Sequence, residues 1–126
     1  MKLLSKILVG IVALEHIYIL ILEMFLWTTP LALNTFGFTP EFAEQTKAFA
    51  TNQGIYNGFL AAGLIWSLLH PNGKVGRQLA IFFTGCVIVA AIVGGMTVKM
   101  SILFTQGMPA LLALLSILLL RNNDKA

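Results

Sequence analysis

Charged side chains are scarce in this sequence: of its 126 residues, 10% are charged and 58% are hydrophobic. Soluble domains average about 25% charged and about 45–50% apolar residues, and a soluble chain of this size could not bury so much apolar surface. Disorder is excluded too, because disordered chains are polar and highly charged. The eight Lys and Arg residues are scattered, which excludes a nucleic-acid binder of the usual basic-faced kind. We therefore expect a small integral membrane protein whose main partner is the lipid bilayer.

Metal-ligating and redox side chains are equally few. The chain has one cysteine, Cys86, and two histidines, His16 and His70, which are too few ligands for the cysteine- and histidine-based sites of zinc or haem. It also lacks a G-x-S-x-G elbow, a P-loop, a dinucleotide fingerprint and an H-E-x-x-H motif. We expect no metal, no cofactor and no catalytic residue, and the sequence favours a protein that is not an enzyme.

Apolar runs of about 20 residues, the length of a helix that crosses the hydrocarbon core, occur four times. They cover residues 7–27, 48–69, 78–98 and 102–120. Thr28-Thr29-Pro30 ends the first run, the turn sequence His70-Pro71-Asn72-Gly73 ends the second, and Arg121 ends the fourth. The sequence thus predicts an all-α, polytopic membrane protein: a single domain, residues 1–126, in which four transmembrane helices form a bundle.

The second of these helices has a start signal well before its apolar run. Thr39 is a suitable N-cap, Pro40 suits the first helical position, and Glu41 favours the positive end of the helix dipole. This helix is therefore predicted to begin near residue 40, outside the bilayer, and to enter the membrane near residue 48.

Lysines and arginines near the span ends predict the orientation, because cytoplasmic loops are enriched in them. One side of the membrane would hold six of them, namely Lys2, Lys6, Lys74, Arg77, Arg121 and Lys125, and the other side would hold two, Lys47 and Lys99. Both termini are therefore predicted to face the cytoplasm, with the chain in the inner (plasma) membrane. This bias also disfavours a chain that inserts in both orientations.

Three ionisable residues interrupt the first span: Glu15, His16 and Glu23. Such groups are costly at membrane depth and usually face the bundle interior or a wet cavity. His16 and Glu23 are seven residues apart, so they project within about 20° of each other, whereas Glu15 projects about 80° from Glu23. One broad side of this helix is therefore polar.

The second span carries a set of matching polar side chains, Asn52, Gln53, Tyr56 and Asn57, which share a face through two i,i+4 pairs. Counting the helical rise places Asn52 and Gln53 at about the depth of Glu23, and Tyr56 and Asn57 nearer His16. Lys99 ends the third span on the same outer side. We expect an outward-biased polar pocket lined by Glu15, His16, Glu23, Asn52, Gln53, Tyr56, Asn57 and Lys99.

Each of these residues also has a purely structural interpretation. Asn, Gln and Tyr inside bundles most often hydrogen-bond one helix to another, His16 could be a satisfied buried group, and Glu23 could pair with Lys99. Small residues at four-residue spacing mark close helix contacts; they are Gly54, Gly58 and Ala62 in the second span, and Cys86, Ala90 and Gly94 in the third. Such contacts could lie within one chain or between the copies of a homo-oligomer.

Three functions fit these features. A polar pocket could bind or transport a small polar or cationic molecule as its ligand, although transport through four helices would require a parallel oligomer. Alternatively, the small-residue faces could dock an accessory or interaction protein onto a partner. A third alternative is a membrane-embedded enzyme that uses Glu15 and His16 as acid and base on a lipid-like substrate.

Two stretches of the sequence carry a family resemblance, residues 12–27 around Glu15-His16 and residues 50–61 with the segment Asn-Gln-Gly-x-Tyr-Asn-Gly. In these stretches the chain resembles a bacterial family of small four-helix membrane proteins, the domain-of-unknown-function family numbered 1304. The resemblance spans nearly the whole chain. It implies the same four-span fold and no particular activity.

Overall fold

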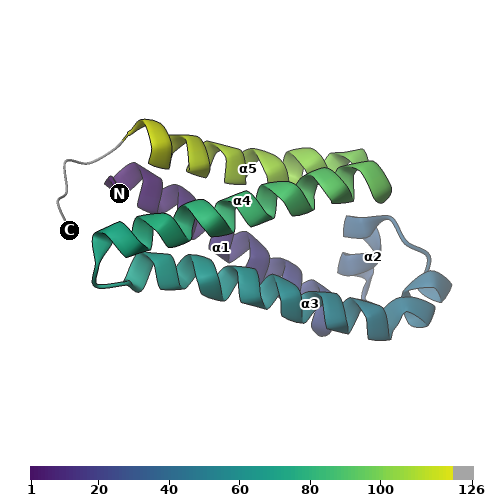
Figure 1. Ribbon diagram of the computed structural model, residues 1–126. Coiled ribbons are helices and arrows are strands. Elements are labelled where there is room, and N and C mark those ends of the chain that lie inside the picture. Colours follow the sequence, from purple (N-terminus) through teal and green to yellow (C-terminus); the bar gives the residue numbers. More distant parts are fainter. Residues whose placement is uncertain (121–126) are drawn as a thin grey trace. The chain divides into compact units, whose positions relative to one another are not determined.

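The computed structural model describes residues 1–120, which form five helices with no strand among them (Figure 1). The helices are α1 (Leu3–Met24), α2 (Pro30–Phe36), α3 (Pro40–Leu69), α4 (Gly73–Thr97) and α5 (Met100–Leu119). The all-α prediction is confirmed. Arg121, predicted to end the fourth span, and Lys125, counted in the orientation, lie outside the described residues.

Three of the helices, α1, α4 and α5, are long and apolar enough to cross a membrane. Helix α3 is longer, with 30 residues, but the part that would cross contains Asn52, Gln53 and Asn57. Their amides lower the mean hydropathy of α3 because each is costly to transfer out of water. Three apolar helices of this length are typical of a membrane protein, and a fourth span on α3 stays a prediction.

The helices start where their capping residues place them. Helix α3 begins at Pro40, and the Thr39 hydroxyl oxygen accepts a hydrogen bond from the Phe42 amide at 3.2 Å. At the start of α4 the Asn72 carboxamide oxygen accepts from the amides of Lys74 at 2.9 Å and Val75 at 3.3 Å. Such caps satisfy amides that the first helical turn leaves without a partner.

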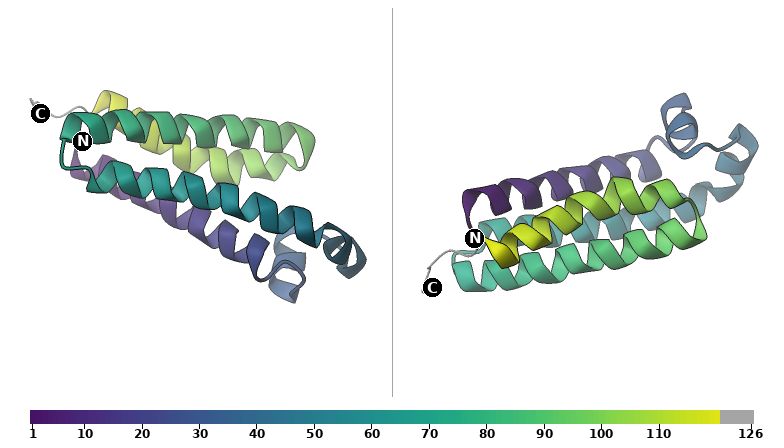
Figure 2. Two further views of the ribbon diagram at one scale, coloured as in Figure 1. Left: turned by 60° about the horizontal axis from the view of Figure 1, so that its bottom comes forward. Right: turned by 90° about the horizontal axis from the view of Figure 1, so that it is seen from above.

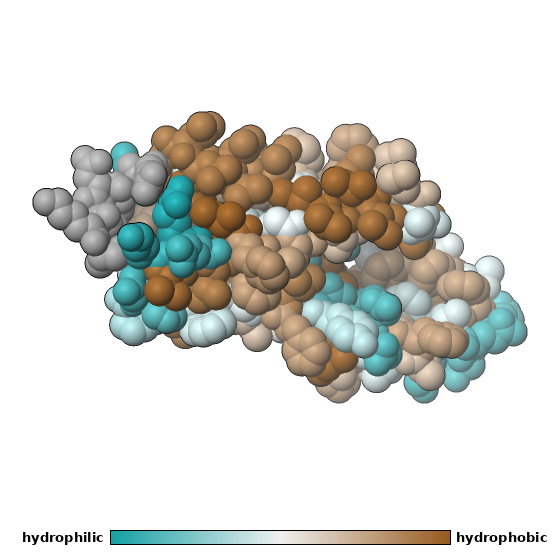
Figure 3. All heavy atoms as spheres, viewed as in Figure 1, coloured by the Kyte–Doolittle hydropathy of each residue, from teal (hydrophilic) through white to brown (hydrophobic). Residues whose placement is uncertain are grey.

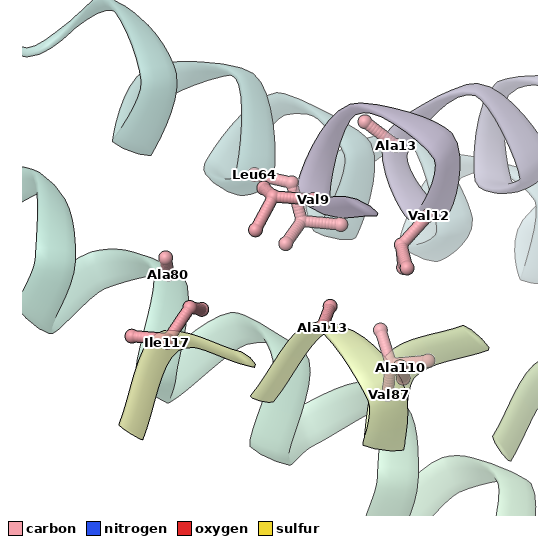
Figure 4. Close-up of a cluster of buried hydrophobic side chains, with 9 residues drawn as sticks. All are labelled: Val9, Val12, Ala13, Leu64, Ala80, Val87, Ala110, Ala113 and Ile117. Atoms are coloured by element: carbon pink, nitrogen blue, oxygen red, sulfur yellow. The ribbon is translucent and has the colours of Figure 1, made fainter. Parts of the chain in front are cut away.

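The chain divides into two compact units, one made of Met1–Glu15 with Leu60–Ala126 and the other of His16–Phe59. The buried cluster of the first unit takes side chains from four helices: Val9, Val12 and Ala13 of α1, Leu64 of α3, Ala80 and Val87 of α4, and Ala110, Ala113 and Ile117 of α5 (Figure 4). Most of these side chains are small, so the helices pack through close backbone approach.

Helices α4 and α5 run antiparallel, side by side, in every view (Figures 1 and 2). Near the turn that joins them, Gly94 lies against Ile102 and Gly95 against Leu103; a Cβ at Gly95 would lie 2.8 Å from the Leu103 Cβ. The surface of α5 in Figure 3 is almost uniformly hydrophobic, with Phe104 59% and Leu112 51% exposed. A surface of this kind suits contact with lipid.

The second unit contains the later part of α1, helix α2 and the first part of α3. Helix α3 packs against α1 through two glycines, because Gly54 lies against Leu20, Glu23 and Met24, and Gly58 lies against Leu20. The small residues predicted to mark a close helix contact therefore make one within the chain at these two positions.

Helix α2 was not predicted from the sequence, although its boundaries carry recognisable signals. Pro30 occupies its first turn, and Gly37 ends it with φ 74° in the left-handed region that favours glycine. Beside it lies a group that we call the aromatic cluster: Trp27, Phe36, Phe38 and Phe42, whose neighbouring ring centroids lie 4.7–5.7 Å apart. The Trp27 indole N–H also donates to the Thr46 hydroxyl at 3.1 Å.

Candidate functional site

Glu23 and Asn57 form a direct bond between α1 and α3 inside the second unit. The Asn57 side-chain amide donates to the Glu23 carboxylate, and the same amide lies 3.3 Å from the Gln53 carbonyl oxygen on its own helix. Both side chains are half-buried. We take this Glu23–Asn57 pair as the centre of the candidate site.

Gly54 explains why the two helices approach closely enough for this bond. A Cβ at Gly54 would lie 3.3 Å from the Glu23 Cβ and 3.4 Å from the Leu20 carbonyl oxygen, and it would overlap Met24. Asn57 lies almost one turn further along α3, on the same side as Gly54. A larger residue at position 54 would push α1 away and take the Glu23 carboxylate out of reach.

Gly54, the neighbour of Gln53, lies against Glu23, so Gln53 lies near the level of Glu23, as rise counting predicts. Rise counting put Asn57 nearer His16 and did not predict the hydrogen bond that Asn57 donates to Glu23. In the structure α1 ends at Met24, directly after Glu23, while α3 runs from Asn57 back to Pro40, a rise of about 25 Å.

Three further predicted site residues, Asn52, Gln53 and Tyr56, are exposed on α3. Tyr56 is 52% exposed and meets Phe59 edge-on, with ring centroids 6.1 Å apart. Two carboxamides and an aromatic ring are therefore accessible on the same helix as Asn57, within two turns of it. They offer hydrogen-bond donors, acceptors and an aromatic face.

The remaining predicted site residues are placed differently. His16 belongs to the second unit and is 1% exposed, so its ring could reach a ligand only after a rearrangement. Glu15 and Lys99 belong to the first unit. The Glu15 Oε1 atom is buried with no hydrogen-bond partner within residues 1–120, and Lys99 is exposed at the start of α5. A common pocket for all eight residues stays a prediction.

The Glu23–Asn57 pair joins an ionisable carboxyl group to a neutral partner. An amide donor stabilises a carboxylate by a charge-assisted hydrogen bond, but it does not cancel the negative charge. A half-buried carboxylate beside exposed amides can therefore still attract a cation or a hydrogen-bond donor. Within residues 1–120, no group of three or more His, Cys, Asp and Glu side chains could hold a metal ion.

The fold and this pair describe a small all-helical protein with membrane-type helices and a polar contact between two of them. The chain belongs to the family described as "Protein of unknown function (DUF1304)", which matches residues 10–118, so the family resemblance is confirmed. It is similar to the "Uncharacterized protein YpaA" of Lactococcus lactis subsp. lactis (strain IL1403), with 35% identity over 120 residues that cover 92% of this chain and 98% of that protein. No solved structure matches the chain.

Proposed function

We propose that the protein is a four-span membrane protein that binds a small polar or cationic molecule at the Glu23–Asn57 pair, on the outward-facing side. The observation that carries this proposal is the half-buried Glu23 carboxylate, which accepts a hydrogen bond from a neutral amide. The exposed side chains of Asn52, Gln53 and Tyr56 supply further contacts for the ligand.

The proposed topology has α1, α3, α4 and α5 as spans and both termini in the cytoplasm. Residues 48–69 of α3 contain no charged side chain, and their amides would be satisfied by α1, by the ligand or by water. The excess of Lys and Arg at the inner ends of the spans supports this orientation.

Single cysteines test this topology in intact cells. In a Cys86→Ser background, a membrane-impermeant maleimide is expected to label Gln45→Cys before permeabilisation and Gly73→Cys only afterwards. Gln45 is exposed on α3 before the proposed span, and a Cβ at Gly73 would meet no atom within 4 Å, so neither substitution should disturb packing. If both cysteines are labelled from the same side, α3 does not cross the membrane.

A cation is the ligand that the site would bind best. A carboxylate in a partly desolvated site attracts an opposite charge more strongly than it does in water. The exposed Tyr56 ring can add a cation–π contact, which is worth about 0.5–2 kcal/mol. A primary or quaternary amine fits both groups, because it presents a positive charge on a small body.

Glu23→Gln is the variant that tests binding. Purified protein is titrated with a panel of ethanolamine, choline and tetramethylammonium, and binding is measured by calorimetry. Removing the charge while keeping the shape is expected to weaken binding of the best ligand by about tenfold or more, because a hydrogen bond to a charged group is worth about 1.5–3 kcal/mol. Glu44→Gln, an exposed acid on the same helix as Asn57, is the matched control and should bind as the native protein does.

Two results would contradict the proposed ligand class: no amine of the panel binds the native protein, or Glu23→Gln binds as tightly as Glu44→Gln. Uptake of the bound amine into proteoliposomes then separates a transporter from a binding protein. The alternative of an accessory protein would use the small residues that remain accessible: Gly54, Gly58 and Gly94 make close contacts within the chain, whereas Ala62 and Ala90 are exposed.

A further inference from the structure

Four cations gather at one end of the first unit, and we call them the basic rim: Lys2, Lys6, Lys74 and Arg77. Lys2 and Lys6 lie at the start of α1, and Lys74 and Arg77 lie in the first turns of α4; these two helix starts are at the same end of the unit in Figures 1 and 2. Within residues 1–120 the acids are Glu15, Glu23, Glu41 and Glu44, and none of them lies in these turns. The rim is therefore strongly positive.

The packing of the first unit determines how far the rim residues lie from the buried cluster along α1 and α4. Lys6 lies one helical turn before Val9, and Arg77 lies one turn before Ala80, and both Val9 and Ala80 belong to the same buried cluster. Along each helix, Lys2 with Lys6 and Lys74 with Arg77 are spaced so that their side chains share a face. All four cations are thus held within about two turns of the apolar core.

Arg77 differs from the three lysines of the rim in its surroundings. The lysines are exposed, whereas Arg77 is half-buried and its Nε atom is buried with no hydrogen-bond partner within residues 1–120. Ser5, between Lys2 and Lys6, is fully buried, and its hydroxyl oxygen also has no partner in this part of the chain. Leaving a buried donor without an acceptor is unfavourable, and more so when the donor is charged.

Three backbone amides at the start of α4 already have acceptors. The amides of Lys74 and Val75 donate to the Asn72 side chain, and the Gly76 amide donates to the Asn72 carbonyl oxygen. The positive end of this helix still adds to the field of the rim. An anion with several acceptor oxygens would match the donors of the rim.

We infer that the basic rim binds a phosphate group, which anionic phospholipids present at this level beside the ends of membrane helices. The Arg77 guanidinium matches phosphate geometry with its planar donors. The lysines of the rim add a charge attraction of the kind that juxtamembrane basic residues exert on anionic lipid. This site belongs to the first unit and does not depend on the ligand proposed at the Glu23–Asn57 pair.

Thermal unfolding of the purified full-length protein in detergent tests the site. Phosphatidylglycerol is expected to raise the unfolding temperature with a saturable dependence, and phosphatidylcholine, whose headgroup has no net charge, is expected to do so much less. Arg77→Gln should weaken the apparent phosphatidylglycerol affinity by about tenfold, and Lys74→Gln by about fivefold. Lys99→Gln, which removes an exposed cation from the far end of α4, should leave the affinity unchanged.

A parallel titration with inorganic phosphate separates the two sources of this anion. If phosphate alone stabilises the native protein and Arg77→Gln abolishes the effect, the rim binds a free phosphate and the lipid assignment changes while the site stands. If both phospholipids act equally, or if Lys74→Gln behaves as Lys99→Gln does, the inference is wrong. Lys74 is exposed, so its variant decides the matter even if Arg77→Gln does not fold.

Discussion

Gly76→Ala is expected to destabilise the protein by about 3 kcal/mol, the upper part of the usual range for overpacking. A Cβ at position 76 would lie 2.6 Å from the Ser67 carbonyl oxygen and 3.8 Å from the His70 Cβ. The obstacle is backbone, so no side-chain rotation can relieve the overlap. The end of α3 and the start of α4 would have to separate, although a short turn, residues 70–72, joins them.

Gly85→Ala in the same helix is the matched control. A Cβ at Gly85 would meet no atom within 4 Å, so this change adds a methyl group without a clash and should leave stability equal or slightly higher. Unfolding in mixed micelles by increasing sodium dodecyl sulfate, followed by tryptophan fluorescence, measures both variants. Equal unfolding midpoints for the two variants would show that α3 and α4 do not meet at Gly76.

The helices were predictable because their signals are local. Capping residues place the start of α3, and apolar length places the apolar segments of α1, α4 and α5, without any tertiary information. The start of α4 at Gly73 lies before the apolar run that was predicted from residue 78. Helix α2 was missed because it has only seven residues, too few to show a periodic pattern. The proline at its start and the glycine after it were the available signals.

The polar site was predictable only in part, because its geometry depends on how one helix is offset along another. Sequence reasoning placed Glu23 and Asn57 among the polar residues of their helices and set Gln53 near the depth of Glu23, yet it did not predict that Asn57 bonds to Glu23. That offset is set by the contact of Gly54 with Glu23 and Met24 and by the aromatic cluster beyond the end of α1. These are tertiary contacts between residues up to about thirty positions apart in the sequence. Capping signals and hydrophobic periodicity describe only one helix at a time, so they do not predict such contacts.

Trp27→Ala is expected to destabilise the protein by about 3 kcal/mol, the lower end of the range for Trp→Ala changes, because Trp27 is only half-buried. The change removes ring contacts with Phe36 and Phe38 at centroid distances of 5.0 and 5.1 Å, and the hydrogen bond to Thr46. These contacts tie the chain just after α1 to the first turns of α3. Their loss should therefore also loosen the Glu23–Asn57 pair and weaken amine binding.

Two further tryptophan variants separate the contributions of the ring and of the hydrogen bond. Trp27→Phe keeps an aromatic ring in the cluster and loses the indole N–H, so it should cost only about 1 kcal/mol. Trp66→Ala removes the other tryptophan, which is 54% exposed and lies in the first unit, and it should leave amine binding unchanged. Since the aromatic cluster sets the offset of α1 along α3, Trp27→Ala must reduce both stability and binding. A variant that unfolds more easily yet binds the amine with native affinity would show that Gly54 alone positions Glu23 against Asn57.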